Sequence, residues 1–171
     1  MRLRSIIRDI VSLTAIAVRA QGGSSSGLYT STIPAIATPS PTPLSMAHTN
    51  AGTLPSKLEI HCSGAKMSDN YALEISKAAE LLDRSCYGGN KIVIPIRSAM
   101  YWFNDDTQIY YCNYQWTVQE TCSAAEFSEV DRHLDIACGE GIGGWIYMPQ
   151  WGESIGRDPL NPDGTRRTEC W

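Results

Sequence analysis

Regular alternation of apolar and polar residues first appears at residues 57–62. Leu58, Ile60 and Cys62 would share one face of an extended segment, and the polar residues between them would share the other. A period of two residues is typical of a strand with one buried face. This segment is therefore the first predicted strand.

Two later segments change to helical spacing. The first follows candidate caps at residues 68–70 and ends at Gly88-Gly89; its apolar face consists of Tyr71, Ile75, Ala78, Ala79 and Leu82. The second starts with Ser123-Ala124-Ala125-Glu126, which has the form of a capping box, and ends at Gly139; its apolar face consists of Phe127, Val130, Leu134 and Ala137. A helical period between start and stop signals predicts a helix in each case.

Residues that favour strands dominate three more segments. Residues 91–103 and 107–116 flank a short Asn104-Asp105-Asp106 turn and predict a hairpin, and residues 144–148 predict a last strand. Pro95 has no N–H for a ladder, so we expect it at a sheet edge or a bulge. The C-terminal tail is rich in turn residues and predicts no further strand.

The predicted order of elements is β-α-β-β-α-β. It is typical of the split βαβ, or ferredoxin-like, α+β fold, in which two helices cover one face of a four-stranded antiparallel sheet. In the usual spatial order 4-1-3-2, the second strand lies at an edge. That position suits Pro95.

The N-terminal residues 1–20 have the three parts of a secretory signal peptide. A basic start precedes an apolar run and a small-residue end, with cleavage expected after Ala20. An amphipathic anchor or a transit peptide is the alternative. The apolar run is shorter than the ~20 residues that span a bilayer, so we expect a secreted, extracellular protein without stable membrane insertion.

Residues 21–56 carry no charged side chain and are rich in Ser, Thr and Pro. Such a segment buries little apolar surface, so it is predicted to be a flexible arm. An O-glycosylated spacer and a cleaved pro-segment are alternatives. The compact domain is expected over residues 57–171.

The charge of the chain argues against two classes of partner. The formal net charge is -4, and removal of residues 1–20 takes away four arginines and one aspartate, which leaves 10 basic and 17 acidic residues. Nucleic acid and anionic membranes attract basic surfaces, so neither is expected to bind. We expect a monomer whose partner is an unidentified extracellular protein or glycan.

All six cysteines lie within the predicted domain. An even number after a signal peptide predicts disulfides, whereas zinc is disfavoured because no Cys-x-x-Cys motif occurs. Six cysteines allow 15 connectivities. Adjacent ends of the predicted elements favour Cys62–Cys138 and Cys86–Cys122, which leaves Cys112–Cys170.

Candidate catalytic groups are few. Glu59 and His61 share a strand face and could act as a general base with its orienting carboxylate, but a solvated face is the simpler interpretation. His133 is expected on the surface of the second helix. The glycines of residues 139–144 follow a helix, unlike a phosphate-binding loop, and Asp105-Asp106 is expected to be a solvated turn. We predict no catalytic residue, metal or cofactor.

Aromatic side chains are the remaining candidate feature. Aromatic residues dominate interface energetics and stack on sugars, so an exposed subset would indicate a binding surface. The alternative is that most of them fill a small core. The candidate binding aromatics are Trp102, Trp116, Trp145 and Trp151.

Four stretches resemble the small secreted cysteine-rich proteins of filamentous fungi, many of them candidate effectors: YYCNYQW, CSAAE, ACGEGIGGW and WGESIGRDP. The element order also looks like the killer-toxin-like α/β fold. The resemblance covers residues 57–171 and implies no catalytic residues. It implies bridge cysteines at Cys112, Cys122 and Cys138, a helix cap at Ser123 and Glu126, and a connector and strand start at Gly139 and Trp145.

These observations together predict a secreted, non-enzymatic protein of fungal effector type that binds a host or competitor component. A small hydrolase using Glu59 and His61 is one alternative. A membrane-active, killer-toxin-like protein is the other, and the acidic charge disfavours it.

Overall fold

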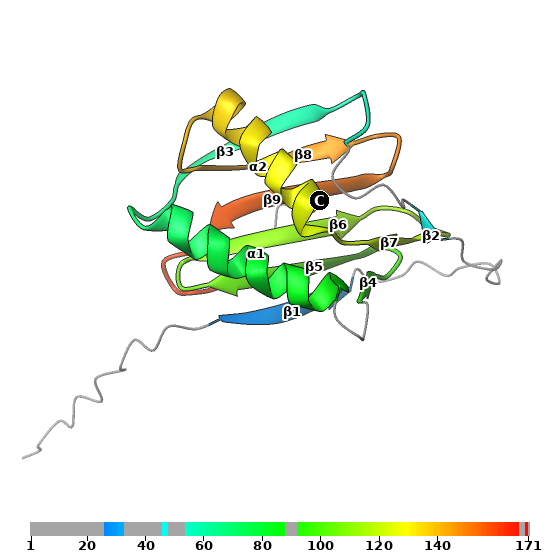
Figure 1. The fold of residues 1–171 in the computed structure, drawn as a ribbon, viewed down its shortest axis with the longest axis horizontal. Helices are drawn as coiled ribbons and strands as arrows, with labels where there is room; N and C mark the ends of the chain where they lie inside the picture. The colour runs from blue at the N-terminus through cyan, green and yellow to red at the C-terminus, as the bar shows by residue number, and fades with distance from the viewer. Residues whose placement is uncertain (1–25, 33–45, 48–53, 88–91, 168–169, 171) are drawn as a thin grey trace, which may run out of the picture.

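The computed structural model describes residues 26–32, 46–47, 54–87, 92–167 and 170, and it shows an α+β fold. Two helices lie on one face of a six-stranded antiparallel sheet (Figure 1). Helix α1 spans Tyr71–Tyr87 and helix α2 spans Ala124–Cys138. Neither helix is long and apolar enough to cross a membrane.

The large sheet joins strands from both ends of the chain. Its members are β1 (Ser26–Thr32), β3 (Glu59–Lys66), β5 (Ser98–Asn104), β6 (Thr107–Asn113), β8 (Ile142–Met148) and β9 (Glu153–Pro159). Their spatial order is β1-β5-β6-β9-β8-β3. A small second sheet consists of β2 (Met46–Ala47), β7 (Gln119–Thr121) and β4 (Val93–Ile94).

Both helix predictions are confirmed, and α2 also has the predicted cap and glycine end, whereas the predicted end of α1 at Gly88-Gly89 lies outside the described residues. At the start of α1, the backbone N–H groups of Leu73 and Glu74 donate to the Asn70 carbonyl at 3.0 and 3.2 Å. At the start of α2, Ser123 Oγ accepts the Glu126 N–H at 3.4 Å, and Gly139 ends the helix with a φ of 99°. These bonds satisfy N–H groups that the helix itself leaves unpaired.

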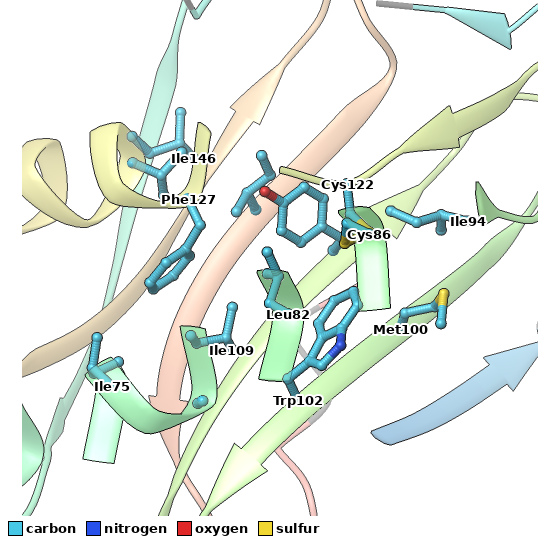
Figure 2. Close-up of a cluster of buried hydrophobic side chains, with 14 of the residues drawn as sticks. Ile75, Leu82, Cys86, Ile94, Met100, Trp102, Ile109, Cys122, Phe127 and Ile146 are labelled. Carbon is cyan, nitrogen blue, oxygen red and sulfur yellow. A yellow bond between two sulfur atoms is a disulfide. The ribbon is translucent and has the colours of Figure 1, made fainter. Parts of the chain in front are cut away.

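The main core lies between the helices and the sheet (Figure 2). Helix α1 contributes Ile75 and Leu82, α2 contributes Phe127, and the sheet contributes Trp102 and Ile109. Leu82, Trp102 and Ile109 are fully buried. Burying each such side chain contributes about 1.5–3 kcal/mol, so this layer is what fixes the helices to the sheet.

The expected four-stranded split βαβ layout is wrong. The tail after Met148 forms strand β9, which lies between β6 and β8. Strand β3, expected in the interior of the sheet, is instead an edge strand that pairs only with β8 in that sheet. Both layouts are antiparallel, and the difference lies in strand order: β9 separates β6 from β8, so β3 pairs with β8 at the edge instead of lying beside β6.

The segment predicted as one strand over residues 91–103 forms two. Val93–Ile94 is β4 in the small sheet, and Ser98–Asn104 is β5 in the large one. Pro95 lies between them, outside both ladders and not at an edge or bulge of one strand, and this position also needs no ladder N–H. The chain turns here through Arg97, which has a φ of 49°.

Part of the predicted arm is ordered structure rather than a flexible linker. Residues 26–32 form β1, which pairs with β5 along its whole length, from Ser26 opposite Asn104 to Thr32 opposite Ser98. The exposed fraction of Leu28 in this strand is 40%. Main-chain pairing therefore covers the outer edge of β5. The expected signal peptide and its cleavage site lie outside the described residues.

Three disulfides connect the layers, and their pairs are those favoured by the order of elements. Cys62 on β3 is bonded to Cys138 at the end of α2, with Cα atoms 5.6 Å apart. Cys86 on α1 is bonded to Cys122 before α2, and Cys112 on β6 is bonded to Cys170 in the tail. The described cysteines include no free thiol.

Candidate functional site

The face of the sheet opposite the helices, here the helix-free face, has a covered half. The C-terminal tail packs over β5 and β6, where Cys170 is bonded to Cys112 and the Arg166 guanidinium lies 4.8 Å from the Tyr101 ring centroid. Tyr101, Cys112 and Cys170 are fully buried. Side chains on this half are therefore withdrawn from solvent.

The other half, over β8 and β3, keeps aromatic side chains at the surface. Trp145 and Tyr147 alternate along β8 and are half-buried, and their cross-strand partners on β3 are His61 and Glu59. The rings of His61 and Trp145 are stacked, with centroids 5.1 Å apart and planes 10° apart. This pair forms the outer end of an aromatic row.

Tyr114 continues the row beyond Tyr147. The two rings meet edge to face, with centroids 5.7 Å apart. Tyr114 is fixed at both ends: its N–H donates to Gly152 O at 2.8 Å, and its hydroxyl lies 3.0 Å from Ser154 Oγ. Burial raises the pKa of the Tyr114 hydroxyl, so it stays neutral and available for hydrogen bonds.

Trp116 lies two residues further along and is the most exposed tryptophan in the described chain, with 49% of its surface accessible. The Arg97 guanidinium lies 4.3 Å from its ring centroid, and the same charge acts to lower the pKa of Tyr114. Arg97 therefore lies against Trp116, and its charge also acts on Tyr114. We call this group the aromatic surface; it consists of His61, Tyr114, Trp116, Trp145 and Tyr147.

A buried polar network supports the aromatic surface from within the sheet. Ser63 Oγ donates to Asp158 Oδ1 at 2.5 Å, and the Tyr110 hydroxyl donates to Asp158 Oδ2 at 2.7 Å. Gly156 leaves room for this tyrosine, because a Cβ there would lie 2.6 Å from the Tyr110 ring. The network links β3, β6 and β9 and so holds the face rigid.

The structure separates the four candidate tryptophans. The prediction that Trp102 lies at the surface is wrong. Trp102 is fully buried, and its indole N–H donates to Ser85 Oγ at 3.2 Å. Trp151 is partly buried against the main core. Trp116 and Trp145 belong to the aromatic surface, and both side chains remain accessible to solvent.

The acid–base candidates of β3 are both exposed, on the same face, as their spacing predicts. Glu59 forms an ion pair with Lys57 at 3.5 Å, and His61 stacks on Trp145. His133 lies on α2, 3.5 Å from Glu129. Each of these contacts is one that a surface side chain commonly makes.

The remaining sequence candidates occupy connecting segments. Gly139 and Gly141 join α2 to β8 with positive φ values of 99° and 68°. Asp105 lies in the two-residue turn between β5 and β6 and accepts a bond from Asn104 Nδ2 at 2.9 Å. Within the residues that the structure describes, no group of three His, Cys, Asp or Glu side chains is placed to hold a metal ion.

Two groups of buried charged residues were not anticipated from the sequence. Arg157 on β9 is fully buried and bonds Asp131 and Asp135 of α2. A second group consists of the buried carboxyls Glu120, Glu126 and Glu153. In the sequence, these polar residues have the pattern of surface positions or of a helix cap. Only the tertiary fold brings their side chains together.

Comparison with known proteins identifies no relative: no protein-family model matches the chain, and neither a curated protein nor a solved structure matches it.

Proposed function

We propose that the protein is a secreted, non-enzymatic binding protein of fungal effector type that contacts a host or competitor component through its aromatic surface. Three disulfides support an oxidising, extracellular location, where such bonds persist. The apolar and basic pattern of residues 1–20 supports export.

The observation that carries the proposal is the uneven covering of the helix-free face. The tail buries the aromatic residues over β5 and β6, whereas Trp145, Tyr147 and Trp116 stay accessible. Tryptophan and tyrosine are enriched among the residues that dominate binding energy. The rings of Trp145 and Tyr147 are already held by contacts with His61 and Tyr114, and Trp116 is contacted by Arg97, so little side-chain entropy is lost when a partner binds.

The hydrolase alternative has less support. A general base must lie within hydrogen-bond reach of its orienting group and of the proton that it removes. Glu59 instead pairs with Lys57, and the His61 ring faces Trp145. The contacts therefore favour a recognition role for His61.

The test compares binding by surface variants with binding by matched controls. We expect the double variant Trp116→Ala/Tyr147→Ala to lose roughly 30-fold or more in affinity for the partner recovered from extracellular fluid, the size of a binding hot spot. The control is Leu73→Ala/Ile136→Ala, which removes exposed apolar side chains from the helices, with exposed fractions of 59% and 71%. Circular dichroism checks that both variants are folded.

Equal affinity in both double variants would contradict the proposal. Leakage of dye from lipid vesicles at micromolar protein would instead favour the membrane-active alternative. Hydrolysis that disappears in His61→Ala would favour the enzyme.

A further inference from the structure

Arg97, in the loop between β4 and β5, places a positive charge beside the aromatic surface. Three other described arginines, Arg84, Arg132 and Arg157, each form an ion pair with an acidic side chain. Among the described residues none forms an ion pair with Arg97, which is half-buried and lies over Trp116. A cation that is partly withdrawn from water without a counter-charge gains when a partner supplies one.

The backbone holds this corner of the sheet in place. The Arg97 N–H donates to Gln115 O at 3.2 Å, and Gln115 Nε2 donates to Trp151 O at 2.7 Å. The Tyr114 N–H donates to Gly152 O at 2.8 Å. These bonds join the loop before β5, the segment after β6 and the turn between β8 and β9. A ligand that binds here therefore orders little of the main chain, which lowers the cost of binding.

Arg97 also has a backbone conformation that is uncommon for its residue type. Its φ of 49° lies in the left-handed region, where glycine is at ease and a residue with a Cβ is strained. Asp105 has a similar φ of 50°, but it lies in a two-residue hairpin turn, where such values are ordinary. Strained residues outside such turns cluster at ligand-binding sites, which favours a role for the Arg97 side chain.

The contact with Trp116 leaves part of the guanidinium available. The Arg97 guanidinium carbon lies 4.3 Å from the Trp116 ring centroid. An aromatic ring covers the face of a guanidinium, whereas its five N–H donors point outward in its plane. Two of these donors match the two oxygens of a carboxylate, and such charge-assisted pairs are stronger than bonds between neutral groups. A carboxylate is therefore a chemically suitable ligand.

The local charge is positive here, although the chain as a whole is acidic. Burial raises the pKa of Tyr114, the bond to Ser154 and the charge of Arg97 act to lower it, and no carboxylate is among the described groups that act on it. Glu59 lies across the sheet on β3 and is paired with Lys57. An acidic group that approaches this corner is therefore attracted by Arg97 without a nearby competing carboxylate.

We propose that Arg97, Tyr114 and Trp116 bind an acidic segment of a partner protein: the Arg97 guanidinium pairs with a carboxylate, and the two aromatic rings pack against the apolar stem that carries it. Tryptophan, tyrosine and arginine are the residues enriched in the hot spots of protein–protein interfaces, which favours a protein over a glycan. This inference rests on the proposed function and adds the chemistry of the partner.

The test titrates the isotope-labelled, disulfide-intact protein with a hexaglutamate peptide. Nuclear magnetic resonance follows the Arg97 Nε–H and the Trp116 indole N–H. We expect both signals to shift and saturate at low salt, and the affinity to fall about fivefold or more between about 0.05 M and about 0.5 M salt, because salt screens exposed charges. A hexaglutamine peptide of the same length is expected to give no saturable shift.

Arg97→Lys keeps the positive charge but loses the planar fork of donors. It is expected to weaken hexaglutamate binding about tenfold or more. The matched control is Arg84→Lys, which changes an arginine on α1 that pairs with Glu80, and it is expected to keep the wild-type affinity. Lysine retains a Cβ, so neither change alters the backbone preference at its position, and circular dichroism checks that both variants are folded.

Equal affinity of the wild type and Arg97→Lys would overturn the proposal, as would equal shifts with hexaglutamine. Tighter binding of an oligogalacturonate than of hexaglutamate would overturn it in favour of an acidic glycan. Failure of the proposed function is a separate result, in which Trp116→Ala/Tyr147→Ala keeps the partner recovered from extracellular fluid. If that double variant loses the partner and Arg97→Lys keeps it, only the assignment of Arg97 to an acidic ligand fails.

Discussion

At the scale of single residues, Arg157 shows how a charge can be part of the core. Its side chain is fully buried, and Nη2 donates to Asp135 Oδ1 at 2.5 Å and to Ile142 O at 3.3 Å. Nη1 bonds Asp131. Burial raises the pKa of Asp131, and the adjacent guanidinium opposes that rise, so the carboxylate depends on its partner to stay ionised in the fold.

Removal of this partner gives the first prediction. Arg157→Met keeps an apolar stem but leaves two carboxylates facing β9 without a cation, and we expect a loss of about 3–5 kcal/mol in the free energy of unfolding. Arg132→Met is the control, because Arg132 pairs with Glu129 at the surface with 55% of its side chain exposed. That change is expected to cost under about 1 kcal/mol. Denaturant titration that showed equal costs would refute the assignment.

At the scale of elements, local signals explain which segments could be predicted. The helices carry caps, an apolar period and glycine stops within their own sequence, so α1 and α2 were predicted correctly. Strand β9 has no such signal: ESIGRDP mixes charged residues, Gly and Pro. Its polar side chains are stabilised by partners on other elements, such as Asp131 for Arg157 and Tyr110 for Asp158.

The candidate site was predictable to the same extent. Trp116 and Trp145 could be named from composition, and the shared face of Glu59 and His61 from strand alternation. The contact of Tyr114 with Tyr147 could not, because it depends on β9 lying between β8, which carries Tyr147, and β6, which ends just before Tyr114. Trp102 was misjudged because a β-rich strand of aromatic residues is the same pattern whether one or both of its faces are covered.

Strand β1 was also missed, and it gives a prediction about the sheet edge. Every residue of β5 is buried, and β1 pairs with the edge that would otherwise expose unpaired backbone groups. Alternate residues of an antiparallel strand point their N–H groups toward the partner, so the adjacent changes Tyr29→Pro/Thr30→Pro must remove at least one ladder bond.

We expect this double proline variant to self-associate, because an uncovered, apolar strand edge is a template for pairing with another chain. Size-exclusion chromatography with light scattering over a range of concentrations measures the change. Leu28→Thr is the control, since it keeps the backbone N–H and alters a side chain that is 40% exposed. A double proline variant that stayed monomeric at every concentration would show that β1 does not protect the edge.

At the scale of the whole molecule, the disulfides connect segments that are distant in sequence. The bridged cysteines are separated by 76, 36 and 58 residues. Loop-closure entropy for loops of this size contributes about 4 kcal/mol per bridge, and a domain of this size has a total stability of only about 5–15 kcal/mol. Full reduction is therefore expected to unfold the protein, with loss of its native circular dichroism.

Loss of one bridge should have a more local effect, and Cys112–Cys170 is the most informative. This bridge holds the tail over the helix-free face, where Arg166 contacts Tyr101 and the Arg167 carbonyl accepts a bond from Gln108. In Cys112→Ser/Cys170→Ser the tail can leave the sheet while the two helix bridges remain. We expect trypsin to cleave after Arg166 and Arg167 about tenfold faster or more, because cleavage of a locally opened segment follows its open population.

The matched variant Cys86→Ser/Cys122→Ser removes a bridge of similar calculated contribution at the opposite face of the sheet. It is expected to lower the unfolding midpoint without accelerating cleavage of the tail in the folded protein. Equal cleavage in the two double variants, measured by mass spectrometry at a temperature where both stay folded, would mean that opening of the tail follows global stability. Faster cleavage only in Cys112→Ser/Cys170→Ser would show that the Cys112–Cys170 bridge keeps the tail over one half of the helix-free face. The aromatic surface is then the half that stays accessible.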